Sequence, residues 1–210
     1  ELNRRSEIDS IICVTGQHRQ MLDQVLEAFD IKPDYDLDIM KSGQTLTDIT
    51  VRVLEGMNGV IAKTAPDIVL VHGDTSTAFA AALSAFYNRV PIGHVEAGLR
   101  TYNKYSPYPE EINRQFIGSV ADMNFAPTEK SRQNLINEGK KPETIYVTGN
   151  TAIDAMRLTV RDDYSDEITE WAKGSRLIVL TAHRRENIGD TMRGMFRAIR
   201  RICEKYDDVK

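Results

Sequence analysis

Three acidic residues of this sequence have the types and surroundings that acid–base chemistry needs. Asp74 lies in the segment HGDTST, Glu96 in HVEAGLRT and Glu110 in YSPYPEEINR. Carboxylates supply an acid and a base, and neighbouring cations can bind an anionic leaving group. If the three carboxylates meet at one crevice, they are suited to proton transfer next to a phosphorylated ligand.

Histidines and arginines accompany these carboxylates. Each of the four histidines follows or ends an apolar run of the chain: His18, His72, His94 and His183. One histidine alone is as often a hydrogen-bonded structural residue as a ligand contact, but four at expected strand ends favour a polar ligand site. Arg184 and Arg185 could hold a diphosphate, although an arginine pair after a strand is often a solvated turn.

Two of these segments also have a purely structural interpretation. The GDTST loop could hold a phosphate, yet Asp74 or Thr75 could equally cap the following helix. Neither a GxxxxGK loop nor a GxGxxG fingerprint occurs in the chain. Glu110 and Arg114 are four residues apart on a helix expected to begin at Pro109, where such a pair stabilises any helix. The buried face of that helix is predicted to be Ile112, Phe116, Ile117 and Val120.

Short apolar runs alternate with longer segments of helical period, as in a βα repeat. The runs are IICVT at 11, IVLV at 68, PIGHV at 91, MNFA at 123, TIYVT at 144 and LIVLT at 177. Runs without polar alternation are typical of parallel strands covered on both faces. We therefore predict an α/β fold with a doubly wound parallel sheet, whose strands end at one common edge. The helical period is clearest in Met21, Leu22, Val25, Leu26 and Phe29, and in Met192, Met195, Phe196, Ile199, Ile202, Cys203 and Tyr206.

Composition excludes several classes of protein. The chain has 27 Lys and Arg against 31 Asp and Glu, a net charge of −4, so binding of nucleic acid through bulk charge is excluded. No apolar run approaches the roughly 18 residues of a membrane span, and the first ten residues contain no signal-like stretch, so we expect a cytoplasmic protein without a membrane partner. Cys13 and Cys203 lack ligand spacing and are predicted to be buried free thiols. No metal site is indicated.

The charged segment RDDYSDEITEWAKGS marks a predicted domain boundary. We expect one Rossmann-like domain over residues 1–166 and the start of a second domain over residues 167–210. The chain opens like the end of a helix whose preceding strand is absent, and it closes on a single β-α unit. One strand and one helix cannot form a core of their own.

The segments HGDTST, HVEAGLRT, YSPYPEEINR, APTE, VTGNTAIDA and TAHRREN, in this order and at these distances, closely resemble the bacterial non-hydrolysing UDP-N-acetylglucosamine 2-epimerases. The match runs from GQHRQML to almost the last residue. The resemblance implies a two-domain fold of the GT-B type, with the UDP-sugar in the cleft between the domains. It also implies that no metal or other cofactor takes part, and that the protein is a homodimer.

The family interconverts UDP-N-acetylglucosamine (UDP-GlcNAc) and UDP-ManNAc. UDP is eliminated across C1 and C2 of the sugar, and is added back to the glycal intermediate with the opposite configuration at C2. The resemblance implies that Asp74, Glu96 and Glu110 are the acid and base carboxylates and that His183 lies against the diphosphate and sugar. It implies substrate contacts for His72, Arg100, Arg114, Asn150 and Arg184.

Bacterial members also bind a second UDP-GlcNAc as an allosteric activator, and the resemblance implies this role for Gln17, His18, Gln20 and Gln44. Gly43 stands where related enzymes commonly have an arginine, so a side chain that could pair with a phosphate is absent, and the sequence leaves open whether this weakens activation. The family's GTRPE loop and the segments that grip uridine lie outside these 210 residues, so we expect no measurable epimerisation by this chain alone.

Three other functions remain open. A hydrolysing relative would release UDP and free ManNAc because water intercepts the glycal. A GT-B glycosyltransferase would use cleft carboxylates on an acceptor hydroxyl, although it needs fewer of them than the three present. A non-catalytic UDP-sugar-binding fragment is the third alternative.

Overall fold

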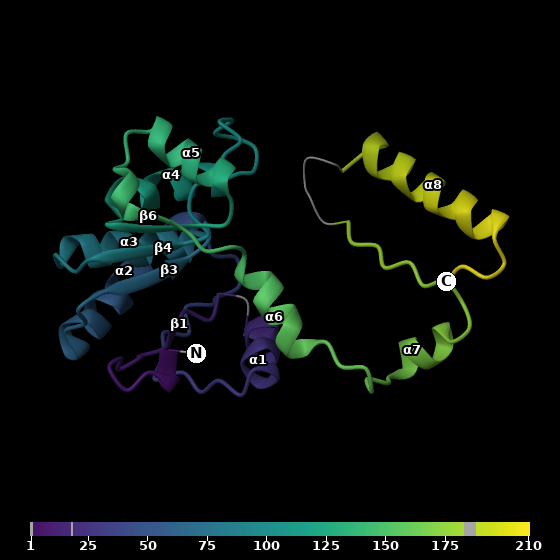
Figure 1. Cartoon of the computed structure of the whole chain (residues 1–210), viewed down its shortest axis with the longest axis horizontal. Helices are drawn as coiled ribbons and strands as arrows, with labels where there is room; N and C mark the ends of the chain where they lie inside the picture. The colour runs from purple at the N-terminus through teal and green to yellow at the C-terminus, as the bar shows by residue number, and fades with distance from the viewer. Residues whose placement is uncertain (1, 18, 183–187) are drawn as a thin grey trace. The chain divides into compact units, whose positions relative to one another are not determined.

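The computed structural model describes residues 2–17, 19–182 and 188–210 (Figure 1). The chain divides into two compact units, Glu1–Leu158 and Thr159–Lys210, which are described separately below as unit 1 and unit 2. The division lies between residues 158 and 159, eight residues before the boundary predicted after residue 166. It coincides with the end of the helix Thr151–Thr159.

Unit 1 is built on parallel strands, as predicted. The main sheet has four strands in the order β3 (Val69–His72), β4 (Ile92–Val95), β5 (Met123–Ala126) and β6 (Ile145–Val147). A separate parallel pair joins β1 (Cys13–Val14) to β2 (Tyr35–Asp36). Five of the six predicted apolar runs therefore contain a parallel strand, and the α/β class is confirmed.

Helices connect and cover these strands. They are η1 (Leu2–Arg4), α1 (Arg19–Ala28), α2 (Leu46–Thr64), α3 (Ser76–Tyr87), α4 (Glu110–Val120), α5 (Glu129–Asn137), η2 (Pro142–Thr144) and α6 (Thr151–Thr159). α3 packs against both α2 and α4. Three of its alanines, Ala80, Ala82 and Ala85, are fully buried, because small side chains let the neighbouring helices approach closely.

Two hydrophobic clusters form the core of unit 1. The larger one joins α2, α3 and α4 to β3 and β4 through residues such as Val53, Val71, Ile92 and Ile117. Cys13 packs at its margin as a half-buried free thiol, 3.7 Å from the sulfur of Met57, and burial raises the pKa of that thiol. The smaller cluster, Ala97, Ala126, Leu135 and Ile145, holds α5 on β5 and β6.

The first helix is less buried than its sequence period predicts. α1 forms as expected, but Met21 and Val25 are exposed and Leu22 and Leu26 are half-buried. The spacing of the apolar residues therefore predicted the helix correctly but did not predict how deeply its apolar side chains are buried in unit 1.

Unit 2 contains α7 (Glu167–Ala172) and α8 (Asp190–Lys205). The predicted strand at LIVLT is wrong for the described residues: only Arg176 and Ile178 bond to residues 208–210, through three backbone hydrogen bonds of 2.7 to 3.0 Å. Val179, in the middle of this run, is 85% exposed.

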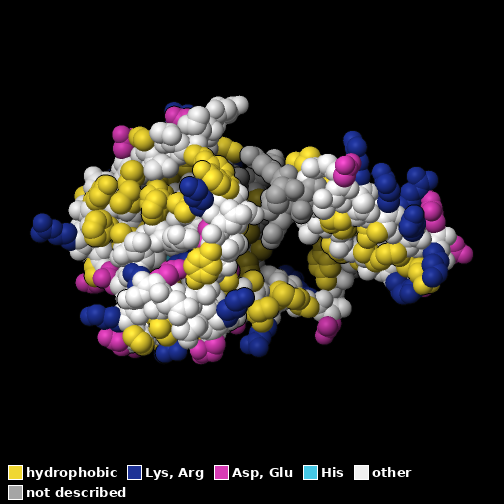
Figure 2. All heavy atoms as spheres, turned by 90° about the horizontal axis from the view of Figure 1, so that it is seen from above, with side chains coloured by type: hydrophobic (Ala, Val, Ile, Leu, Met, Phe, Trp, Pro, Cys, Tyr) yellow, Lys and Arg dark blue, Asp and Glu magenta, His cyan; other side chains and the backbone are white. Residues whose placement is uncertain are grey.

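α8 carries the predicted apolar stripe next to a basic one, yet none of its residues is buried. Figure 2 shows the Lys and Arg side chains of unit 2 gathered along one edge, with hydrophobic side chains beside them. Cys203 on this helix is exposed, so the prediction of a buried thiol is wrong there. Within the described part of the chain, no helix combines the length and the hydrophobicity that a membrane span requires.

Candidate functional site

The loops that follow β3 and β4 meet at the carboxyl edge of the main sheet. His72 pairs in register with Val95, and the amide of Gly73 donates to the carbonyl of Val95 over 3.0 Å. Glu96 follows Val95 directly, and a Cβ placed on Gly73 would lie 3.5 Å from Oε2 of Glu96. Glu96 has a φ of +68°, a left-handed conformation that is uncommon for residues other than glycine and often marks a functional position.

Helix α4 is fixed to the loop after β3 through Asp74. The Asn113 side chain donates to the backbone carbonyl of Asp74 over 2.9 Å, and Arg114 Nη2 lies 2.7 Å from Asp74 Oδ2. The side chain of Asp74 is 27% exposed, whereas that of Arg114 is only 11% exposed. Glu110, half-buried, lies one helical turn before Arg114 on the same helix. These contacts bring Asp74, Glu96 and the start of α4 to one edge of unit 1.

The pairing of Glu110 with Arg114, which is the structural alternative for this segment, is not found among the ion pairs of the described residues. The ion pairs of Arg114 join it to Asp74 and to Glu111. Helical spacing would allow Arg114 to pair with Glu110. Arg114 pairs instead with Asp74, in the loop after β3, and with the buried Glu111, because both carboxylates also need a cation.

The buried face of α4 also differs from the prediction. Ile117 is buried as expected, but Phe116 is 52% exposed, and the buried positions include Glu111 and Asn113. A polar residue enters a core only when its hydrogen bonds are satisfied there. Asn113 bonds to Asp74, which is distant in sequence, whereas Glu111 bonds to the loop just before α4 and to Gln115 on the same helix. Sequence reasoning missed Glu111 because its neighbour Glu110 presents the same signal, an acidic residue in a first turn.

Burial raises the pKa of Glu111, but hydrogen bonds from the Thr101 amide, Gln115 and the Tyr102 amide, together with the charge of Arg114, lower it by more. The net pKa of Glu111 lies below its ordinary value. The carboxylate is therefore held in its charged form inside the protein.

His72 and Asn150 extend the site towards the start of α6. His72 Nε2 lies 3.0 Å from the hydroxyl of Thr151, and the Asn150 side chain donates to Glu96 Oε1 over 3.4 Å. His72 and Asn150 are both exposed, so they can reach a ligand beside Glu96.

His94 lies inside β4, which corrects the expectation that every histidine is at a strand end. Its side chain is fully buried, and Nε2 lies 2.8 Å from the carbonyl oxygen of Gly73. Burial lowers the pKa of His94 to about 4, so the ring is neutral at neutral pH. Since a carbonyl only accepts, Nε2 carries the proton and supports the loop that contains Asp74.

Arg100 faces the protein rather than the edge of the sheet. Its fully buried guanidinium forms a two-pronged ion pair with Glu138, with both distances 2.8 Å, and donates to the carbonyl of Leu99. This geometry favours a structural role, in which Arg100 ties the loop after β4 to the end of α5.

The residues expected at the activator site lie in two segments. Gln17 precedes α1, Gln20 is exposed on it, and Gln44 lies just before α2. Gln44 accepts hydrogen bonds from the Lys41 amide and from Arg52, a cation that sequence reasoning did not single out. Gly43 has a φ of +73°, so a side chain at this position would be strained.

Three predicted residues, His18, His183 and Arg184, lie outside the described residues, as does Arg185. Within residues 2–17, 19–182 and 188–210, no cluster of three His, Cys, Asp or Glu side chains could hold a metal ion.

Comparison with known proteins identifies the family. The protein-family model described as UDP-N-acetylglucosamine 2-epimerase matches residues 1–210. A UDP-N-acetylglucosamine 2-epimerase of Bacillus subtilis is 57% identical over the whole chain, which covers 55% of that relative. The chain thus spans about half the length of the curated relatives it matches.

Solved structures agree with this result. A putative UDP-N-acetylglucosamine 2-epimerase from Listeria monocytogenes superposes with a TM-score of 0.94 at 59% identity, over all of this chain and 55% of that one. A UDP-GlcNAc 2-epimerase from Neisseria meningitidis, solved bound to UDP-GlcNAc, has a TM-score of 0.91 at 44% identity, over 100% and 58% of the two chains. The whole chain therefore belongs to the UDP-N-acetylglucosamine 2-epimerase family.

Proposed function

We propose that this chain forms the N-terminal, Rossmann-like part of a GT-B-type isomerase that interconverts UDP-GlcNAc and UDP-ManNAc through elimination and readdition of UDP. The observation that carries the proposal is the meeting of Asp74, Glu96 and the start of α4 at one sheet edge. Ligands bind at this edge in open α/β sheets. The Neisseria meningitidis relative, which was solved with UDP-GlcNAc, supports the choice of substrate.

The chemistry explains why several carboxylates are needed. The C2 proton of the sugar has no adjacent carbonyl and is barely acidic, so its removal must be coupled to departure of the diphosphate. Readdition with inversion at C2 then requires acidic groups that reach both faces of the glycal. In our proposal Asp74, Glu96 and Glu110 supply these groups.

The remaining side chains would bind the ligand or hold the carboxylates. We propose that His72 and Asn150, both exposed next to Glu96, contact the sugar. Arg114 orients Asp74, which keeps part of its carboxylate free. His183 and Arg184 would face the diphosphate, while no ligand contact is proposed for Arg100 because its guanidinium is buried against Glu138.

The proposal extends to the partners of the whole protein. It would act as a homodimer without a metal or other cofactor, and a second UDP-GlcNAc would bind near Gln17, His18, Gln20 and Gln44. Arg52 hydrogen-bonds to Gln44, so it could offer this second ligand the positive charge that Gly43 lacks.

The test is isotope exchange in an enzyme of the relatives' length that contains this sequence. UDP-GlcNAc is supplied in heavy water and the sugar is followed by NMR. UDP-ManNAc with deuterium at C2 is expected. Free ManNAc with UDP would indicate the hydrolysing reaction, and no exchange would indicate a transferase or a binder. The 210-residue chain alone is expected to show no measurable epimerisation.

A further inference from the structure

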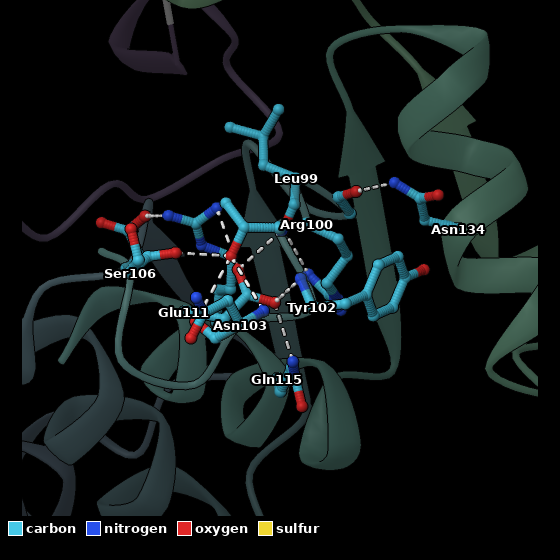
Figure 3. A network of polar contacts seen from close by, with 12 residues as sticks. Leu99, Arg100, Tyr102, Asn103, Ser106, Glu111, Gln115 and Asn134 are labelled. Atoms are coloured by element: carbon cyan, nitrogen blue, oxygen red, sulfur yellow. Dashed lines mark hydrogen bonds and ion pairs between the residues drawn. The ribbon is translucent and has the colours of Figure 1, made fainter. Parts of the chain in front are cut away.

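Glu111, the neighbour of Glu110, is a buried carboxylate without a part in the proposed chemistry. Its Oε2 accepts from the Thr101 amide over 3.0 Å, and its Oε1 accepts from the Tyr102 amide over 3.0 Å and from Gln115 over 2.8 Å (Figure 3). The side chain is fully buried. It therefore does not reach a ligand at the sheet edge, and any effect on turnover must pass through its neighbours.

The first neighbour is the loop between β4 and α4. Tyr102 adopts a φ of +58°, which is unfavourable for a residue with a side chain. Two consecutive amides that donate to one carboxylate stabilise this conformation. The Thr101 hydroxyl donates to the Ser106 carbonyl over 2.6 Å, and the Glu111 amide donates to the Pro107 carbonyl over 3.1 Å. Glu111 thus ties both ends of the loop 101–107 to the first turn of α4.

The second neighbour is Arg114. Its Nη1 lies 3.5 Å from Glu111 Oε2, and its Nη2 lies 2.7 Å from Asp74 Oδ2. One guanidinium therefore joins a buried carboxylate to a partly exposed one. Because three hydrogen bonds hold the buried partner in place, it limits the rotamers from which Arg114 can reach Asp74.

We propose that Glu111 is a positioning residue that anchors the loop 101–107 and holds Arg114 against Asp74, so that Asp74 and Glu110 face the same ligand. The expected effect on turnover rests on the function proposed above, whereas the anchoring of the loop 101–107 by Glu111 is independent of that function.

Glu111→Gln in the epimerase of the relatives' length tests the effect on turnover. Glutamine keeps the shape but replaces one acceptor oxygen with an amide group that opposes a backbone N–H. We expect kcat to fall about 10- to 100-fold and KM to change less than about threefold, because the ligand contacts remain while the reacting groups are misplaced. The matched control is Glu129→Gln: Glu129 lies in the first turn of α5, pairs with Arg132 at the same spacing over 3.8 Å and is 77% exposed. It should leave kcat and KM unchanged.

Amide hydrogen exchange of the ligand-free protein tests the anchoring without any turnover. In Glu111→Gln the Thr101 and Tyr102 amides should exchange at least about tenfold faster than in the parent, and by a larger factor than the α3 amides, whose exchange reports unfolding of the whole unit. The inference is overturned if these two amides keep their rates, if exchange rises equally throughout unit 1, or if KM rises while kcat stays. If the parent enzyme does not epimerise, the proposed function fails, and the exchange rates still decide whether Glu111 anchors the loop.

Discussion

The first turns of α4 and α5 carry the same Glu-x-x-Arg spacing in different surroundings. In α4, Glu111 is fully buried and shares Arg114 with Asp74. In α5, Glu129 is largely exposed and Arg132 lies 3.8 Å away. One local pattern therefore forms part of a buried network in one helix and a solvated pair in the other.

The helix caps differ in the same way. The hydroxyl of Thr128 accepts from the Ser131 amide, so α5 has a side-chain cap of its own. α4 begins after Pro109, which makes no side-chain cap hydrogen bond, and its acidic first turn contacts the preceding loop instead. An acidic first turn stabilises α5 through the helix dipole, whereas in α4 it also connects the helix to the candidate site.

The largest difference is expected in turnover. Glu110→Gln in the epimerase of the relatives' length should lower kcat by about 10²- to 10⁴-fold, because a proton-transferring carboxylate is lost. Glu129→Gln should leave kcat within about twofold of the parent. Steady-state rates of UDP-ManNAc formation decide the matter, and a Glu110→Gln enzyme that keeps a tenth of its kcat would remove Glu110 from the acid–base set.

The next difference is expected in stability. Glu111→Ala should lower the free energy of unfolding of unit 1 by about 3 kcal/mol, because the Thr101 and Tyr102 amides lose their acceptor and the partly buried Arg114 keeps only Asp74. Glu129→Ala should cost less than about 0.5 kcal/mol, as is usual for exposed pairs. The slowest-exchanging amides of α3 report this free energy in each variant. Equal losses in the two variants would contradict the contrast.

A smaller effect is expected at the cap of α5. Thr128→Ala should cost about 1 kcal/mol, because the Ser131 amide loses its acceptor. Exchange of the α5 amides measures the loss, and kcat should remain within about twofold. A large fall in kcat would mean that α5 is coupled to the site as closely as α4.

The smallest effect is expected in how the unfolding free energy depends on pH below neutrality. The lowered pKa of Glu111 means that the unfolded chain takes up this proton before the folded protein does as pH falls below the ordinary value of 4.5. The stabilising contribution is complete above about pH 4.5 and is lost as pH falls through the lower, folded-state pKa. The difference in unfolding free energy between the parent and Glu111→Gln should therefore shrink as the pH falls below about 4.5. A constant difference would show that Glu111 does not contribute through its charge.

Much of the fold followed from apolar runs, because strands covered on both faces leave an unbroken hydrophobic stretch. The run LIVLT is equally apolar but forms no strand among the described residues, and the isolated bridge next to it joins Arg176 to Val209. His94 and Arg100 have the polarity of ligand contacts and yet are directed into the protein. Polarity at a strand end shows only that a side chain needs a partner, and both a ligand and a distant carbonyl or carboxylate can meet that need.

Local spacing alone was sufficient for the α/β class, for a helix cap at either Asp74 or Thr75, and for the segments that carry Asp74, Glu96 and Glu110. The structure shows that Thr75 is the cap. Only the tertiary structure decided that Arg114 pairs with Asp74 and that Glu111 rather than its neighbour is buried. The physical reason is that strand and helix periods depend on residues a few positions apart. The partners of a buried charge, by contrast, depend on how loops fold back onto a helix, as do the loop after β3 that contains Asp74 and the loop before α4 that contains Thr101.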